Sequence, residues 1–160
     1  MSAVTVSHEL ALWRDIAALK GTIERALEQR LQRDAGISVA DFDILSALVD
    51  AIGGRLRARD LAETVAWEKS RLSHQVTRME TRGLVVREDC PSDLRGTWIV
   101  LTEAGHDAAA RSLPGHADVL GEHFSVLDDE ARSALDDAIR RVKVSSAAVC
   151  ESQGSDSCTG

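Results

Sequence analysis

The segment 69–82 carries side chains that could hydrogen-bond to the edges of nucleic-acid bases. Its apolar residues Leu72, Val76 and Met79 recur at helical spacing and predict a helix with one buried side. The side chains left outside are mostly hydrogen-bond donors and hydroxyls: Lys69, Ser70, Arg71, Ser73, His74, Gln75, Thr77 and Arg78. No carboxylate occurs between Glu68 and Glu80. A face that enters a DNA major groove must avoid carboxylates because they repel phosphate, so this segment favours a DNA-reading helix.

Arginines alternate shortly before this helix, at Arg55, Arg57 and Arg59. Arg57 is a candidate contact to a DNA phosphate, which would position the protein on a duplex without specifying a sequence. The same residues could instead be ordinary surface arginines. The spacing leaves both interpretations open.

The charge of the chain is unevenly distributed. The formal net charge is −7, which at first speaks against nucleic acid as a partner. Residues 55–96, however, contain nine basic and seven acidic groups, whereas the flanking segments are both acidic. Phosphate attraction is screened within roughly 8–10 Å, so a DNA-binding protein needs a local positive surface rather than a positive total. Only the middle third of the chain could form one.

The elements that must position these residues follow from hydrophobic periodicity and turn signals. We expect helices over residues 7–33, 39–51, 58–65, 69–82, 103–112 and 128–149, and strands over 84–88 and 97–101. Pro114-Gly115 is expected to interrupt or end the fifth helix. The polar residues 151–160 are expected to be a disordered tail.

Helix ends carry recognisable capping residues. Ser38 is a candidate N-cap with Asp41 at the N3 position, and Gly83 is a candidate C′ residue after the 69–82 helix. Glu68 is a poor N-cap for that helix. Trp67 could compensate by packing on Leu72 as a hydrophobic staple.

The order of helix, short helix, tight turn, helix and two-stranded ribbon is that of a winged helix-turn-helix. We therefore expect a mainly α fold with a small β-wing, in which the DNA-binding lobe covers residues 39–102. One domain is expected over residues 1–150. The helices over 7–33 and 128–149 are expected to form a homodimer, because long apolar stripes rarely stay exposed.

The region from Arg57 to Gly105 resembles the MarR family of bacterial regulators. The matching residues are Asp60-Leu61-Ala62, Ser70, Arg78-Met79-Glu80, Gly83-Leu84-Val85, Asp93-Leu94-Arg95 and Leu101-Thr102-Glu103-Ala104-Gly105. The resemblance implies a homodimer on a pseudo-palindromic double-stranded DNA operator, with the 69–82 helix in the major groove. It also implies that Arg95 reaches a minor groove, that Asp93 helps to hold the wing, and that a small aromatic molecule or an oxidant releases the DNA.

Three other features have a functional and a plain interpretation. His116 and His123 could share a helix face and bind a metal, with oxygens from Asp118 and Glu122. A metal site would need these further ligands in a tight geometry, and we expect no bound metal. Cys90 could be a redox sensor or a small strand residue. The aromatic residues Trp13, Phe42 and Trp67 could line an effector pocket or belong to the core.

Composition excludes several other classes. No apolar run approaches the ~20 residues needed to span a bilayer, and residues 1–9 lack the features of a signal peptide, so a cytoplasmic protein is expected. We find no nucleophile–base pair, phosphate loop or cofactor motif, so no enzyme and no cofactor is expected. The sequence predicts a DNA-binding transcription regulator, and we expect it to act as a repressor. The alternative is a winged-helix module for protein–protein assembly.

Overall fold

The computed structural model describes residues 3–89 and 96–154, with side chains described for 8–89 and 96–145. The chain contains helices α1 (Ala3–Ala35), α2 (Val39–Val49), α3 (Ala58–Thr64), α4 (Lys69–Thr81), α5 (Glu103–Phe124) and α6 (Asp129–Gly154), the 3-10 turn η1 (Ile52–Gly54), and strands β1 (Arg55–Arg57), β2 (Val85–Asp89) and β3 (Thr97–Leu101). It divides into two compact units, Met1–Gly121 and Glu122–Gly160.

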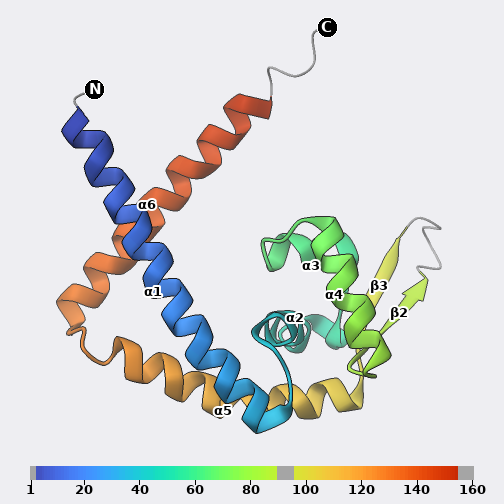
Figure 1. Cartoon of the computed structure of the whole chain (residues 1–160). Coiled ribbons are helices and arrows are strands. Elements are labelled where there is room, and N and C mark those ends of the chain that lie inside the picture. The colour runs from blue at the N-terminus through green and yellow to red at the C-terminus, as the bar shows by residue number, and fades with distance from the viewer. Residues whose placement is uncertain (1–2, 90–95, 155–160) are drawn as a thin grey trace, which may run out of the picture. The chain divides into compact units, whose positions relative to one another are not determined.

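The predicted winged helix-turn-helix fold is confirmed. Helices α3 and α4 are joined by the tight turn at residues 66–68, in which Ala66 adopts a positive φ of 55°. Figure 1 shows α3 and α4 in green beside the β2–β3 hairpin. Gly83, with φ of 72°, ends α4 as the predicted C′ residue, since a left-handed backbone suits glycine.

The sheet has one strand more than the sequence pattern predicts. Its antiparallel order is β1-β3-β2, and the register pairs Leu56 with Ile99 and Arg57 with Trp98. Strand β1 is the Arg55–Arg57 segment that we interpreted only as alternating arginines. That alternation around Leu56 is itself the period-two pattern of a half-buried strand.

The core lies between α2, α3, α4, the sheet and the ends of α1 and α5. Its fully buried side chains include Leu31, Ile44, Leu45, Leu61, Val76, Met79, Val85 and Ile99. The predicted cap of α2 is confirmed as a capping box: Asp41 N donates to Ser38 Oγ at 3.0 Å, and Ser38 N donates to Asp41 Oδ2 at 2.9 Å. This reciprocal pair fixes the point at which α2 begins.

The prediction that Pro114-Gly115 interrupts or ends the fifth helix is wrong, because α5 runs unbroken to Phe124. A proline inside a helix removes one backbone hydrogen bond, and tertiary packing can offset that loss. Here Gly115 is buried, and a Cβ at this position would overlap Asp34 Oδ2 and lie 2.6 Å from Arg30 Nε of α1. The close approach of α1 to α5 therefore requires glycine at position 115.

The two terminal helices expose much of their apolar surface. The C-terminal part of α1 joins the core through Leu27 and Leu31, whereas Trp13, Ile16 and Leu19 are exposed. The described side chains of α6, over 129–145, are exposed along their length. Helix α6 continues to Gly154, past the expected start of the tail at 151, and 155–160 lie outside the described residues. Within the described part of the chain, no helix is long and apolar enough to cross a membrane.

Candidate nucleic-acid interface

Helix α4 presents most of the predicted contact residues to solvent. Its buried side is formed by Leu72, Val76 and Met79. The exposed predicted residues are Lys69, Ser70, Arg71, Ser73, His74, Thr77 and Arg78. At 100° per residue, the positions most nearly opposite the buried side are Ser70, His74, Thr77 and Thr81. Thr81 belongs to this outer face, although the sequence analysis did not include it.

The predicted exposure of Gln75 is wrong. Its side chain is 4% exposed, and its Nε2 donates to Asp41 Oδ1 of α2 at 2.7 Å. The physical reason is that Asp41 is itself buried and needs donors for its two oxygens. The acceptor lies 34 residues away in the sequence, so the local pattern of α4 could not indicate it.

The arginines of α4 are held by contacts within the protein. The guanidinium carbon of Arg71 lies 4.0 Å from the centre of the Trp67 ring, a cation–π contact at the start of the helix. Arg78 donates to Oε1 of Gln75. Such contacts reduce the number of side-chain conformations, so less entropy is lost when these groups bind a further partner.

The start of α4 lacks a side-chain cap. Glu68 is the N-cap residue, and its side chain makes no capping hydrogen bond. Trp67 is partly buried against the core cluster that contains Leu72. The predicted hydrophobic staple between Trp67 and Leu72 stays a prediction.

A basic groove lies between α4 and the sheet. Its volume is about 310 Å³, and it is lined by Ala58, Arg59, Lys69, Leu72, Ser73, Val76, Arg87, Thr97 and Ile99. The charged side chains in this lining are all cations. Arg59 is paired with Asp60 and Glu63, and Arg87 is paired with Glu80, so these carboxylates offset part of the positive charge beside the groove.

Arg87 of β2 connects the wing to α4, a role that the sequence analysis missed. Its Nη1 lies 2.6 Å from Glu80 Oε2, and its Nη2 lies 3.0 Å from both the Ser73 carbonyl and Thr77 Oγ1. The Arg87 backbone N–H donates to Glu80 Oε1 at 3.0 Å. Hydrogen bonds from this backbone N–H and guanidinium lower the pKa of Glu80. The available signal in the sequence was an acidic residue near the end of α4, Glu80, followed by a basic residue in the next strand, Arg87.

The arginines of β1 flank a tryptophan. The guanidinium carbons of Arg55 and Arg57 lie 5.0 and 5.4 Å from the centre of the Trp98 ring. Trp98 is on the face of the sheet opposite Ile99, which is buried, so Arg57 belongs to the outer face of the sheet. The wing residues Asp93 and Arg95, and also Cys90, lie outside the described residues.

Phe42 separates two hollows between α2 and its neighbours. Its ring stacks on His116 of α5, with centroids 4.2 Å apart and planes at 21°. An open hollow of about 460 Å³ includes Asp43 and His116 in its lining, and a more apolar one of about 270 Å³ includes Val49 and Leu113. Burial lowers the pKa of His116, while the nearby charge of Asp43 acts in the opposite direction. Trp13 and Trp67 are not part of either lining.

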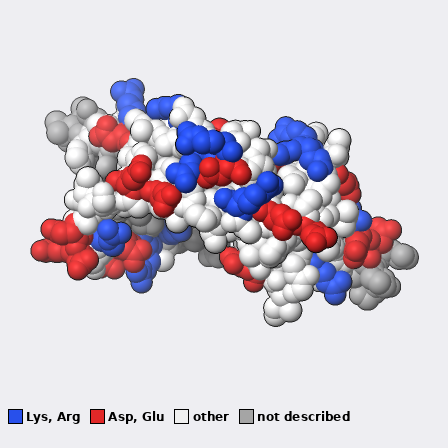
Figure 2. Space-filling model, turned by 90° about the horizontal axis from the view of Figure 1, so that it is seen from below, with Lys and Arg blue, Asp and Glu red and all other residues white. Residues whose placement is uncertain are grey.

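Charge is mixed on one face of the molecule. On the face seen in Figure 2, Lys and Arg side chains alternate with Asp and Glu side chains. In the part of the chain that the structure describes, no group of three or more His, Cys, Asp or Glu is arranged to hold a metal ion.

The fold and the face of α4 define a winged helix-turn-helix protein. The sequence model of the MarR family matches residues 35–96. The crystal structure of Sco3205, a MarR family transcriptional regulator from Streptomyces coelicolor in complex with DNA, is 37% identical, with a TM-score of 0.80 over 86% of each chain. AbsC, a MarR family transcriptional regulator from the same organism, is 36% identical, with a TM-score of 0.79 over 89% of this chain and 94% of AbsC.

The chain therefore belongs to the MarR family of transcriptional regulators. The predicted family is confirmed, and these relatives are regulators rather than enzymes, as predicted for this chain. A further relative is the organohalide-sensing regulator RdhR-CbdbA1625, solved with 2,4-dichlorophenol bound. It is 26% identical, with a TM-score of 0.78 over 84% of this chain and 79% of the other.

Proposed function

We propose that this regulator binds double-stranded DNA in a sequence-specific manner and that α4 reads base edges in a major groove. The observation that supports this best is the exposed, carboxylate-free face of α4 around Ser70, Ser73 and Thr77. Hydroxyl and amine groups can hydrogen-bond to base edges and to phosphates, whereas a carboxylate would repel the phosphates. The related regulator Sco3205 was solved in complex with DNA.

The proposed contacts divide into two kinds. Arg71 in the first turn of α4 reads a guanine, and Ser70, Ser73, His74, Thr77 and Arg78 complete the contact with the groove. Lys69 and Arg57 bind phosphates, and the basic groove beside Lys69 accommodates the sugar–phosphate backbone. Gln75 acts inside the protein, since it is buried against Asp41.

For the wing, the proposal rests on the family resemblance. Arg95 enters a minor groove, where a narrow groove concentrates negative potential, and Asp93 holds the wing in shape. Arg87 supports this arrangement by binding the hairpin to Glu80 and to Ser73 of α4.

The proposed regulator is a homodimer formed through α1 and α6. Trp13 and Ile16 of α1 are 67% and 50% exposed, and Ile139 of α6 is 48% exposed, so both helices offer apolar stripes that a second copy could cover. A two-fold dimer binds two half-sites of a pseudo-palindrome. Light scattering should give twice the chain mass of 17.3 kDa. Ile139→Glu should shift the protein toward the monomer, whereas a wild type that remains monomeric at micromolar concentration would contradict this proposal.

A small aromatic effector is proposed to bind in the hollows beside Phe42. The support is the aromatic and apolar lining of the smaller hollow and the 2,4-dichlorophenol bound to RdhR-CbdbA1625. A ligand that binds better to the form of the dimer with the wrong spacing lowers DNA affinity by linkage. Titration of phenols and aromatic acids into the DNA complex tests this idea, with Phe42→Ala as the variant that should lose the response.

A dimer that occupies an operator blocks access to it, so we propose repression as the regulatory effect. The test is fluorescence anisotropy with duplexes taken from the DNA that flanks the regulator's own gene, at physiological salt. We expect one duplex to bind at least about 10³-fold more tightly than a scrambled duplex, as specific regulators do. In vitro transcription from that duplex should then decrease. Equal binding to both duplexes would favour the alternative, a winged-helix module for protein–protein assembly.

A further inference from the structure

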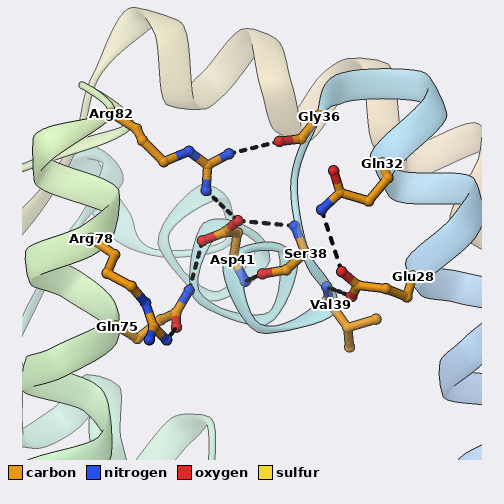
Figure 3. Close-up of polar contacts among 9 residues, drawn as sticks. All are labelled: Glu28, Gln32, Gly36, Ser38, Val39, Asp41, Gln75, Arg78 and Arg82. Atoms are coloured by element: carbon orange, nitrogen blue, oxygen red, sulfur yellow. Dashed lines mark hydrogen bonds and ion pairs between the residues drawn. The ribbon is translucent and has the colours of Figure 1, made fainter.

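A buried carboxylate, that of Asp41, links α4 to the start of α2. Asp41 of α2 is 1% exposed, and its oxygens accept hydrogen bonds from three donors, two of them on α4 or its C-cap and one in the turn before α2. Oδ1 accepts from Gln75 Nε2 at 2.7 Å, and Oδ2 accepts from Arg82 Nη1 at 2.6 Å and from Ser38 N at 2.9 Å. Figure 3 shows these donors converging on Asp41 from opposite sides.

Arg82 extends the contact to the turn between α1 and α2. Its Nη2 donates to the carbonyl of Gly36 at 2.7 Å, while its Nη1 binds Asp41. The other side of the same turn is held by α1, because Glu28 Oε2 accepts from Val39 N at 2.8 Å. One guanidinium at the end of α4 therefore binds both the turn and the first turn of α2.

The spacing of the two α4 donors determines what this contact restricts. Gln75 and Arg82 are seven residues apart, which is two helical turns, so both lie on the same side of α4. The packing of Leu72, Val76 and Met79 already holds the buried side of α4 in the core, and one polar contact would fix the helix at a single further point. Two contacts to one carboxylate restrict both the rotation of α4 and its shift along the axis.

Rotation decides which side chains can face a groove, because each residue occupies about 100° of the helix circumference. A rotation of a fraction of that angle would turn Ser70 and Thr77 away from base edges. It would leave basic side chains near the phosphates, since long flexible cations can still reach them.

We infer that Asp41 is a positioning residue for sequence recognition, which holds Gln75 and Arg82 so that the outer face of α4 meets the base edges. This inference rests on the proposed DNA-binding function. Its consequence is that loss of the contact should lower discrimination between DNA sequences much more than it lowers general DNA affinity.

Two variants test the inference with opposite changes of charge. Asp41→Asn removes a negative charge, and Arg82→Gln removes a positive charge, so general attraction to DNA should rise slightly in the first and fall slightly in the second. Both should lose about tenfold or more in the ratio of operator affinity to scrambled-duplex affinity, the size of one lost base contact. A shared loss of this ratio cannot arise from net charge.

The double variant and a control complete the experiment. Asp41→Asn with Arg82→Gln should lose no more discrimination than the worse single variant, because both changes break the same contact. Arg33→Gln, at an exposed position in the last turn of α1, makes the same change of charge as Arg82→Gln and should leave the ratio within about twofold.

The readout separates folding from recognition. Anisotropy is measured with full-length protein at a temperature where circular dichroism shows each variant folded. If Asp41→Asn does not fold, Arg82→Gln carries the test, since the Arg82 side chain is 42% exposed and leaves a smaller defect. Equal losses for operator and scrambled duplex, or an unchanged ratio, would overturn the inference. A wild type without any operator preference would overturn the proposed function and this inference with it.

Discussion

The guanidinium of Arg87 in β2 and the carboxylate of Glu80 in α4 are joined by a 2.6 Å ion pair, and the Arg87 backbone N–H donates to the same carboxylate at 3.0 Å. Glu80 thus joins the wing to α4, together with the contacts of Arg87 to Ser73 and Thr77. This connection explains why α4 is free of carboxylates up to Glu80 but carries one there: Glu80 faces the sheet rather than the outer face.

Replacement of Glu80 should loosen the wing. Glu80→Gln is expected to lower the free energy of unfolding by about 1 kcal/mol, because the pair is partly exposed and solvent screens it. The folded-state pKa of Glu80 is lowered below 4.5, so its stabilising contribution is present above that pH and is lost as pH falls through the lowered value. Denaturant unfolding from pH 3 to pH 7 measures both effects. Glu88→Gln on the exposed face of β2 is the control and should change little.

Arg71 should contribute to specificity rather than to general affinity. Arg71→Ala is expected to cost roughly 1–3 kcal/mol on the operator and to relax preference at one base position in each half-site. Trp67→Leu should give part of this loss, because the Trp67 ring no longer orients Arg71. Binding to a randomised operator library measures the preference. An Arg71→Ala profile identical to that of the wild type would contradict the assignment.

Arg95 is the matched comparison on the wing. Arg95→Ala should weaken binding to many sequences and reduce the slope of log affinity against log salt by about 0.9 for each lost phosphate contact. Base preference should stay nearly unchanged apart from flanking A·T content. The same library measured at several salt concentrations decides between the two roles. A changed preference in the major-groove half-site would assign direct readout to Arg95 instead.

Gly105 should tolerate no side chain. A Cβ at this position would overlap the Leu84 carbonyl oxygen and lie 2.9 Å from Leu101 Cδ1, so Gly105→Ala is expected to destabilise the protein by about 1–3 kcal/mol. Gly121 in the same helix has open space around its Cα, and Gly121→Ala should stabilise by about 0.5–1 kcal/mol through helix propensity. Thermal unfolding of both variants should shift in opposite directions. A shift in the same direction would indicate that close packing is not the reason for Gly105.

His116 should make the stability depend on pH in the mildly acidic range. Burial holds its folded-state pKa below the ordinary 6.5, so the unfolded chain binds protons more readily as pH falls below that value. Stability should therefore decrease as pH falls through 6.5 toward the lowered pKa. His116→Gln should flatten this part of the profile in unfolding measurements between pH 5 and pH 7.5. An unchanged slope would show that other groups cause it.

The local sequence was sufficient for the order of the helices, the β2–β3 hairpin and most of the outer face of α4, but not for the length of α5 or the burial of Gln75. These features depend on periodicity, on capping residues such as Ser38 and Gly83, and on the types of neighbouring side chains, all of which act within a few residues. The residue types on the outside of α4 indicated its DNA-reading role, and the resemblance of residues 57–105 to known regulators indicated the MarR family.

The tertiary structure decided what depends on partners far away in the chain. Gln75 is buried because Asp41 lies across from it, and α5 continues through Pro114 where Gly115 lies close to α1. Strand β1 exists because β3 offers its edge, and Arg87 binds α4 because the hairpin folds back on that helix. The spacing of apolar residues along one helix shows which side of that helix is buried. It does not show which polar side chain of the helix meets a buried acceptor on another element. Only the packing of the elements against one another decides which polar side chain is buried, since a buried polar group is stable only where its hydrogen-bond partner is in place.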